Sequence, residues 1–177
     1  SQRGTGDKKT MTLATYLYKR AIDTFTAKDF ASFEFPRLIK EDWPTSFKIK
    51  YAMADLLYSQ KDWAKCGPAF DAVVAEDPNG PEAAKSAYAA GLCYQGAYEE
   101  GHKGNVGRRG IGQLPSSSVS QGASAPLQPK EMAPEQVAMV RAFDRYVCTI
   151  KPAANDAAAQ EQLVEVKYAR ARTYFEA

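Results

Sequence analysis

A short tyrosine-containing phrase that occurs three times is the most regular chemical feature of this sequence. The chain reads YAMA at Tyr51, YAAG at Tyr88 and YARA at Tyr168. Tyrosine combines a large contact area with a hydroxyl that can donate a hydrogen bond, and it loses little side-chain entropy when it is fixed. The repetition therefore predicts recognition of another molecule by contact and hydrogen bonding.

The residues that catalysis would need are scarce and poorly placed. The single histidine, His102, lies in a Gly-rich stretch that we expect to be a flexible insertion, so Ser-His-Asp, Cys-His and His-Glu-x-x-His arrangements lack a well-placed member. Acidic pairs such as Asp77 with Glu82, or Glu99 with Glu100, border expected turns and are most simply helix caps or solvated surface. We predict that the protein is not an enzyme and that it has no cofactor or metal site.

Three cysteines, Cys66, Cys93 and Cys148, are widely spaced. With no Cys-x-x-Cys pair and no nearby histidine cluster, they match neither a disulfide framework nor a zinc site. We expect three small core residues in helices. A Cys93–Cys148 bridge is the alternative in an oxidising compartment.

Length and composition indicate one domain of ordinary size, with 177 residues of which 45% are hydrophobic and 25% charged. The net charge of +2 gives no field that would favour nucleic acid or an anionic membrane. No apolar run approaches the roughly 20 residues that cross a bilayer, and the polar N-terminus SQRGTGDKKT lacks a signal-peptide core. We expect a soluble protein of the cytoplasm or of a bacterial periplasm or cell envelope.

Apolar residues recur at three- and four-residue steps, which predicts an all-helical chain without strands. The expected helices run from Thr10 to Lys28, from a cap at Thr45 or Ser46 to SQKD, from Asp62 to EDPNGP, from Glu82 to about residue 100, from Pro134 to Pro152, and from Asn155 or Asp156 to the end. Residues 101–133 are rich in Gly, Ser and Pro, and they predict a flexible insertion.

The segment ADLLYSQKDWAKCGPAFDAVVAEDP resembles a tetratricopeptide repeat. It places small, aromatic and helix-ending residues in the order of that repeat: Ala54, Leu57, Trp63, Cys66, Phe70 and Pro78. Pro44 and Pro78 are 34 residues apart, which is the period of such stacked helical hairpins. The resemblance implies a right-handed superhelical α-solenoid.

The same plan divides the whole chain into units. We expect a degenerate leading unit at 1–45, a repeat at 46–80, a second repeat at 81–152 interrupted by the insertion, and the first helix of a further unit at 153–177. Lys50, Lys167 and Arg170 depart from the plan, because the family usually has apolar residues at these places. An unpaired last helix would expose apolar surface, so we expect a piece of a longer array or an end that packs on another chain.

In tetratricopeptide proteins the first helix of each unit lines a concave groove that binds a protein or peptide. Applied to this chain, the resemblance predicts a partner-binding face on the first helices of the units. Its residues are Lys48, Tyr51, Asp55, Tyr58, Lys85, Tyr88, Leu92, Gln95, Glu165, Tyr168, Arg172 and Phe175. The sequence leaves open whether the tyrosines line this groove or pack between adjacent first helices. Some members of the family bind a C-terminal carboxylate through an arrangement of Lys and Asn side chains. In this chain Tyr51 and Asp55 occupy two of those positions, so a receptor for a C-terminal carboxylate is disfavoured.

The resemblance implies a non-enzymatic interaction scaffold in a multiprotein assembly. The alanine-rich composition of the repeats and the DPNGP turn are similar to those of tetratricopeptide proteins of bacterial cell-envelope and gliding-motility assemblies. The alternative is a regulatory or cell-envelope subunit that contacts a partner protein, RNA or anionic lipid through Lys103, Arg108 and Arg109 of the insertion. The glycines of the insertion neither follow a predicted strand nor precede a predicted helix, so a phosphate-binding loop is a weak interpretation of this segment.

Removing residues 104–129 and joining the flanks is expected to leave the helix content and the melting temperature unchanged, because the segment has few large apolar residues. Circular dichroism of the shortened and full chains checks this. Loss of the folded state would show that the insertion is structural.

Overall fold

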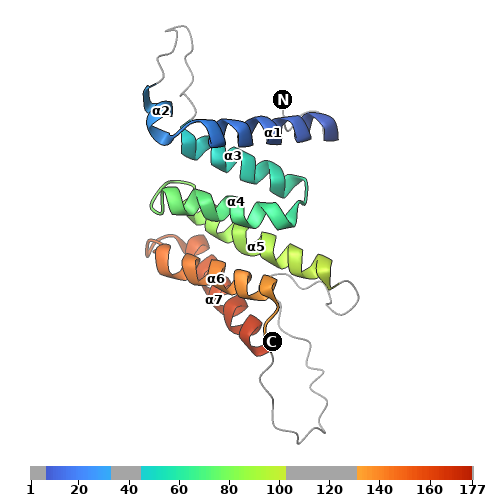
Figure 1. Cartoon of the computed structure of the whole chain (residues 1–177). Coiled ribbons are helices and arrows are strands. Elements are labelled where there is room, and N and C mark those ends of the chain that lie inside the picture. The colour runs from blue at the N-terminus through green and yellow to red at the C-terminus, as the bar shows by residue number, and fades with distance from the viewer. Residues whose placement is uncertain (1–6, 33–44, 103–130, 177) are drawn as a thin grey trace, which may run out of the picture.

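The described part of the protein is all-helical in the computed structural model (Figure 1). It comprises residues 7–32, 45–102 and 131–176 and contains no strand. The helices are α1 (Lys8–Thr24), α2 (Ala27–Ser32), α3 (Ser46–Ser59), α4 (Trp63–Glu76), α5 (Ala83–Gly101), α6 (Pro134–Thr149) and α7 (Ala157–Glu176). The predicted fold class is confirmed at this level. Most of the predicted insertion, residues 103–130, lies outside the described ranges.

Short polar side chains set several helix starts where the sequence predicts them. The Thr45 hydroxyl accepts a hydrogen bond from the Lys48 backbone N–H at 3.2 Å and begins α3. The Asp156 carboxylate accepts one from the Ala159 N–H at 3.0 Å at the start of α7. Such caps satisfy backbone N–H groups that have no partner within the helix.

The first predicted helix is in fact two helices. α1 ends at Thr24, and Thr26 and Asp29 then exchange bonds: the Thr26 N–H donates to Asp29 Oδ2 at 2.7 Å, and the Asp29 N–H donates to Thr26 Oγ1 at 3.3 Å. This reciprocal cap starts α2 at Ala27. The hydrophobic period continues across the break, which is why it predicts one helix to Lys28.

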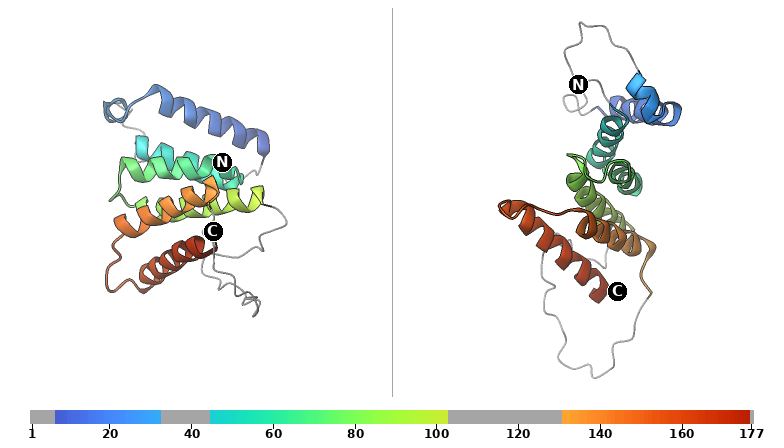
Figure 2. Two further views of the ribbon diagram at one scale, coloured as in Figure 1. Left: turned by 60° about the horizontal axis from the view of Figure 1, so that its bottom comes forward. Right: turned by 90° about the vertical axis from the view of Figure 1, so that its left-hand side faces the viewer.

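Each helix packs mainly on its neighbours in the chain. The contacts run from α1 and α2 to α3, and then successively through α4, α5, α6 and α7. Figures 1 and 2 show α1 and α7 at opposite ends of the stack. Packing between adjacent helices is typical of helical repeat proteins.

The buried core consists of two clusters, and both include residues of α4, α5 and α6. The first also includes α3 and contains Leu57 and Phe70, and the second also includes α7 and contains Phe143 and Val166. Tyr94, on α5, packs against both clusters. The two clusters therefore form a continuous core along the stack.

Glycine allows α5 to approach its neighbours closely. A Cβ atom added at Gly91 would lie 2.6 Å from Cε1 of Phe143 on α6, and one added at Gly96 would lie 2.7 Å from the Trp63 ring on α4. Real Cβ contacts do not come this close, so a larger residue would separate the helices.

The apolar stripe expected on the first helix is only partly covered. Leu13 is 57% exposed and Leu17 is 54% exposed, whereas Ala21 and Ile22 are half-buried. α1 contacts the rest of the described chain mainly at α3, where Gln60 donates a hydrogen bond to the Thr15 hydroxyl at 3.0 Å. Contact on one side leaves the Leu13 side of α1 uncovered.

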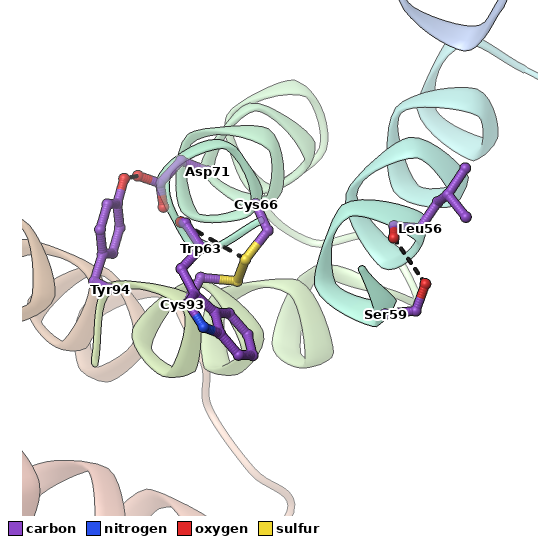
Figure 3. The surroundings of a disulfide bond; sticks show 7 residues. All are labelled: Leu56, Ser59, Trp63, Cys66, Asp71, Cys93 and Tyr94. Carbon is purple, nitrogen blue, oxygen red and sulfur yellow. Dashed lines mark hydrogen bonds between the residues drawn. A yellow bond between two sulfur atoms is a disulfide. The ribbon is translucent and has the colours of Figure 1, made fainter. Parts of the chain in front are cut away.

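The cysteine prediction is wrong in two respects. Cys66 on α4 and Cys93 on α5 form a disulfide, with Cα atoms 5.9 Å apart, and both residues are fully buried (Figure 3). Cys148 is unbonded and exposed, so it is neither a core residue nor the partner of Cys93. Spacing could not show this, because the bond depends on which faces of α4 and α5 meet.

Two of the three basic residues that depart from the repeat pattern take part in ion pairs between helices. Lys50 on α3 pairs with Glu76 on α4 at 2.5 Å, and Arg170 on α7 pairs with Asp144 on α6 at 2.9 Å. Lys167 is exposed. The basic side chains at 50 and 170 therefore connect consecutive helices by charge instead of by apolar packing.

Replacing Phe70, which is 3% exposed, with alanine is expected to lower the free energy of unfolding by about 3 to 5 kcal/mol, because it leaves a cavity in the first core cluster. Urea unfolding measures the change. Phe175→Ala is the matched control: Phe175 is 73% exposed, and its loss should cost less than about 0.5 kcal/mol. Equal stability of the Phe70 variant and the wild type would contradict the packing of α4.

The double variant Cys66→Ala/Cys93→Ala is expected to lose about 3 to 4 kcal/mol, because the bridge spans 27 residues and restricts the unfolded chain. Cys148→Ala, at an exposed site, should unfold like the wild type. In denaturant, thiol titration of oxidised protein should find one reactive thiol before reduction and three after. Three thiols before reduction would show that the bridge does not form.

Candidate functional site

Side chains from α3, α5 and α7 come together although they are far apart in sequence. Glu82, which precedes α5, lies close enough to Tyr51 on α3 to affect its ionisation. Tyr58 on α3 and Glu165 on α7 affect Tyr88 on α5 in the same way. We call this set the tyrosine face: Tyr51, Asp55, Tyr58, Glu82, Tyr88 and Glu165.

The tyrosines of this face rest on aromatic rings of the following helices. The Tyr51 ring meets Phe70 edge to face with centroids 6.3 Å apart, and Tyr58 meets Trp63 at 5.6 Å. Tyr88 meets Tyr146 at 6.3 Å in the same geometry. Edge-to-face contacts of this kind add stability beyond the area they bury. They also fix the ring orientations before any partner binds.

Burial of these tyrosines is partial. Tyr51, Tyr58 and Tyr88 are half-buried and pack against the two core clusters. They therefore contribute to packing, with ring contacts to the helix that follows each of them in the chain, and each retains solvent-accessible surface.

Carboxylates determine the electrostatics around these rings. The pKa of Tyr51 is raised by burial and then by the charges of Glu82 and Asp55, while Lys85 acts in the opposite direction. The pKa of Tyr88 is raised by burial and by Glu165. Both causes disfavour a phenolate. The two hydroxyls therefore stay protonated at neutral pH and can donate hydrogen bonds beside acceptors that carry negative charge.

The remaining predicted site residues are distributed along the same three helices. Lys48 is exposed in the first turn of α3, and Lys85 pairs with Glu82 at 3.3 Å. Leu92, Gln95, Tyr168 and Arg172 are half-buried, Gln95 donates a hydrogen bond to Glu99 at 2.9 Å, and Phe175 is 73% exposed.

Sequence reasoning placed Glu82 among caps and solvated acids and missed its contact with Tyr51. A partial signal was present, because Glu82 lies three residues before Lys85, a spacing at which side chains on a helix are neighbours. The contact with Tyr51 itself depends on how α5 packs beside α3.

A polar network, also missed, connects three helices on another part of the molecule. The Tyr94 hydroxyl donates to Asp71 Oδ2 at 2.7 Å, and Arg145 Nη2 lies 3.1 Å from the same oxygen (Figure 3 shows Tyr94 and Asp71). Burial, and then the hydrogen bond and charge of Asp71, raise the pKa of Tyr94. The network joins α4, α5 and α6 and has the character of a structural contact.

His102 has a local role at the end of α5. Its ring stacks on Tyr98 with centroids 4.2 Å apart, and its Nδ1 lies 2.8 Å from the Tyr98 carbonyl oxygen. Within residues 7–32, 45–102 and 131–176, no three His, Cys, Asp or Glu side chains are grouped as metal ligands. No helix of this part is long and apolar enough to span a membrane.

Comparison with protein-family models, with curated proteins and with solved structures gives no match. The resemblance to tetratricopeptide repeats therefore rests on the residues quoted from the sequence.

Proposed function

We propose that the protein is a non-enzymatic interaction scaffold that binds a partner protein or peptide through the tyrosine face. The observation that carries this proposal is the convergence of Tyr51, Tyr58 and Tyr88 with three carboxylates from separate helices. Rings that are already held by packing lose little entropy on binding, and tyrosine is enriched at sites that dominate binding energy.

The proposed architecture is a solenoid of tetratricopeptide-like hairpins. Packing between consecutive helices supports it, as do the ion pairs Lys50–Glu76 and Arg170–Asp144, each of which joins two consecutive helices. In such an array the first helices of successive units share one side of the stack. The approach of Tyr58, Tyr88 and Glu165 on α3, α5 and α7 agrees with this arrangement.

The disulfide favours one of the expected compartments. Cys66 and Cys93 are fully buried, and a buried bridge between helices is characteristic of proteins that fold under oxidising conditions. We therefore propose a bacterial periplasm or cell envelope for the scaffold in preference to a reducing cytoplasm. This compartment agrees with the similarity of the alanine-rich repeats to those of tetratricopeptide proteins from envelope and motility assemblies.

Affinity capture from a lysate of the source organism tests the proposal with the wild type and with Tyr51→Ala/Tyr58→Ala/Tyr88→Ala. If the face binds, the triple variant should lose a specific partner, because hot-spot tyrosines each contribute about 2 kcal/mol or more. Quantitative mass spectrometry of the captured proteins measures the loss. Tyr16→Ala/Tyr174→Ala is the control, since both residues are exposed on α1 and α7, outside the tyrosine face.

Loss of binding counts only for folded variants, because Tyr51 and Tyr88 also pack against the core. Tyr51→Phe/Tyr88→Phe keeps the rings and removes the hydroxyls, so it separates hydrogen bonding from packing. Equal capture by the wild type and by a folded triple variant would place the contact elsewhere and contradict the proposal.

A further inference from the structure

The exposed large hydrophobic side chains of the described residues are concentrated at the two ends of the helix stack. They are Leu13, Tyr16 and Leu17 on α1, Phe25 where α1 ends, and Val164, Tyr174 and Phe175 on α7. Their exposed fractions lie between 40% and 73%. Because α1 and α7 lie at opposite ends (Figures 1 and 2), each end of the stack presents apolar surface to solvent.

On each end helix the exposed apolar residues lie opposite the face that packs on the stack. Thr15 accepts a hydrogen bond from α3, and Leu13 and Leu17 lie two residues to either side of it, about 200° away around the helix. Val166 on α7 is fully buried in the second core cluster, whereas Val164, two residues earlier, is 64% exposed. A helix that is apolar on two opposite faces is expected to have a neighbour on both.

We call these uncovered faces the α1 stripe and the α7 stripe. The α1 stripe consists of Leu13, Tyr16 and Leu17, and the α7 stripe consists of Val164, Ala171 and Phe175, all of which are exposed.

Charged residues of opposite sign adjoin the two stripes. Arg20 lies three residues after Leu17, Glu161 lies three residues before Val164, and both are exposed. If α7 lay antiparallel on α1, the last turns of α1 would meet the first turns of α7. Arg20 would then lie beside Glu161 while the apolar stripes face each other.

The other charged side chains near the stripes are compatible with this pairing. Lys19 already pairs with Asp23 at 2.7 Å within α1. Lys9, in the first turn of α1, would lie near the ring of Phe175, which attracts a cation. Lys167 is exposed at one edge of the α7 stripe, where its ammonium can remain in water.

We propose that a second copy of this chain covers each stripe, with α7 of one copy packed antiparallel on α1 of the next. The contact continues the stack, in which each helix packs mainly on its neighbours in the chain. It is heterologous, so every added copy leaves one free α1 and one free α7, and rows of copies can form. It uses no residue of the tyrosine face, so it goes beyond the proposed function and can fail independently of it.

The size of this contact sets its expected strength. α1 has 17 residues and is therefore about 26 Å long. One helix of this length laid on another buries about half of the roughly 800 Å² per partner that is typical of stable interfaces. We therefore expect weak association, with a Kd of about 10 to 100 µM.

Sedimentation equilibrium of the full, oxidised chain tests the proposal between about 5 and 500 µM. The average mass should be that of the monomer at the low end and should exceed that of a dimer at the high end, because a heterologous contact does not stop at two copies.

Two variants each block one end without adding charge. Leu13→Gln/Leu17→Gln removes apolar contacts of the α1 stripe, and Val164→Gln/Phe175→Gln removes those of the α7 stripe. Each variant alone should associate at least about tenfold more weakly than the wild type. An equimolar mixture should form dimers with the affinity of the wild-type contact and nothing larger, because each variant supplies one intact stripe.

Two further comparisons control this result. Ala72→Gln/Ala75→Gln changes exposed apolar residues of α4, away from both ends, and should assemble like the wild type. Arg20→Glu should weaken association by about threefold to fivefold, and Arg20→Glu/Glu161→Arg should restore it, because the exchanged charges attract again. Melting curves check that every variant is folded.

Three outcomes would overturn the inference. Monomeric wild type up to about 500 µM would mean that no second copy covers the stripes. Dimerisation of either blocked variant alone at wild-type strength would mean that the intact stripe pairs with itself. Equal weakening by the α4 variant would mean that the contact does not lie at the ends of the stack. Capture of a partner by the tyrosine face tests the proposed function separately.

Discussion

The contact between α4 and α5 is the constraint on which the rest of this structure depends. The Cys66–Cys93 disulfide connects the two helices, and Gly96 lets the Trp63 ring lie directly on α5. The two core clusters meet at this contact, since Tyr94 packs against both. A stack whose helices touch mainly their chain neighbours has few other connections. Separation of α4 from α5 would open both core clusters, because each contains residues of both helices.

The candidate site depends on the same contact. Tyr51 rests on Phe70, and Tyr88 rests on Tyr146, so each tyrosine is positioned by the helix that follows its own. Glu82 reaches Tyr51 only because α5 is held beside the hairpin of α3 and α4. The same packing thus provides stability and arranges a row of hydroxyls and carboxylates from three helices. Binding surfaces of helical repeat proteins are built in this way, from residues that are regular in sequence and shared between units.

Local signals in the sequence predict the elements well, and they predict contacts less well. The caps at Thr45 and Asp156, the restart at Pro134 and the absence of strands in the described residues follow from propensity and hydrophobic period. The break between α1 and α2 was missed because the apolar period runs through it, whereas the Thr26–Asp29 cap stops the helix. The disulfide was missed because no local pattern tells which faces of two helices will meet.

By itself, the sequence determined that the chain is helical and that tyrosine recurs at Tyr51, Tyr88 and Tyr168 on successive predicted helices. These features depend on interactions within a few turns, which neighbouring residues specify. Only the tertiary structure decided that Cys66 bonds to Cys93 and that Glu82 and Glu165 lie beside the tyrosines. The physical reason is that the rotation and spacing of packed helices depend on side chains distant in sequence, such as Gly91 against Phe143.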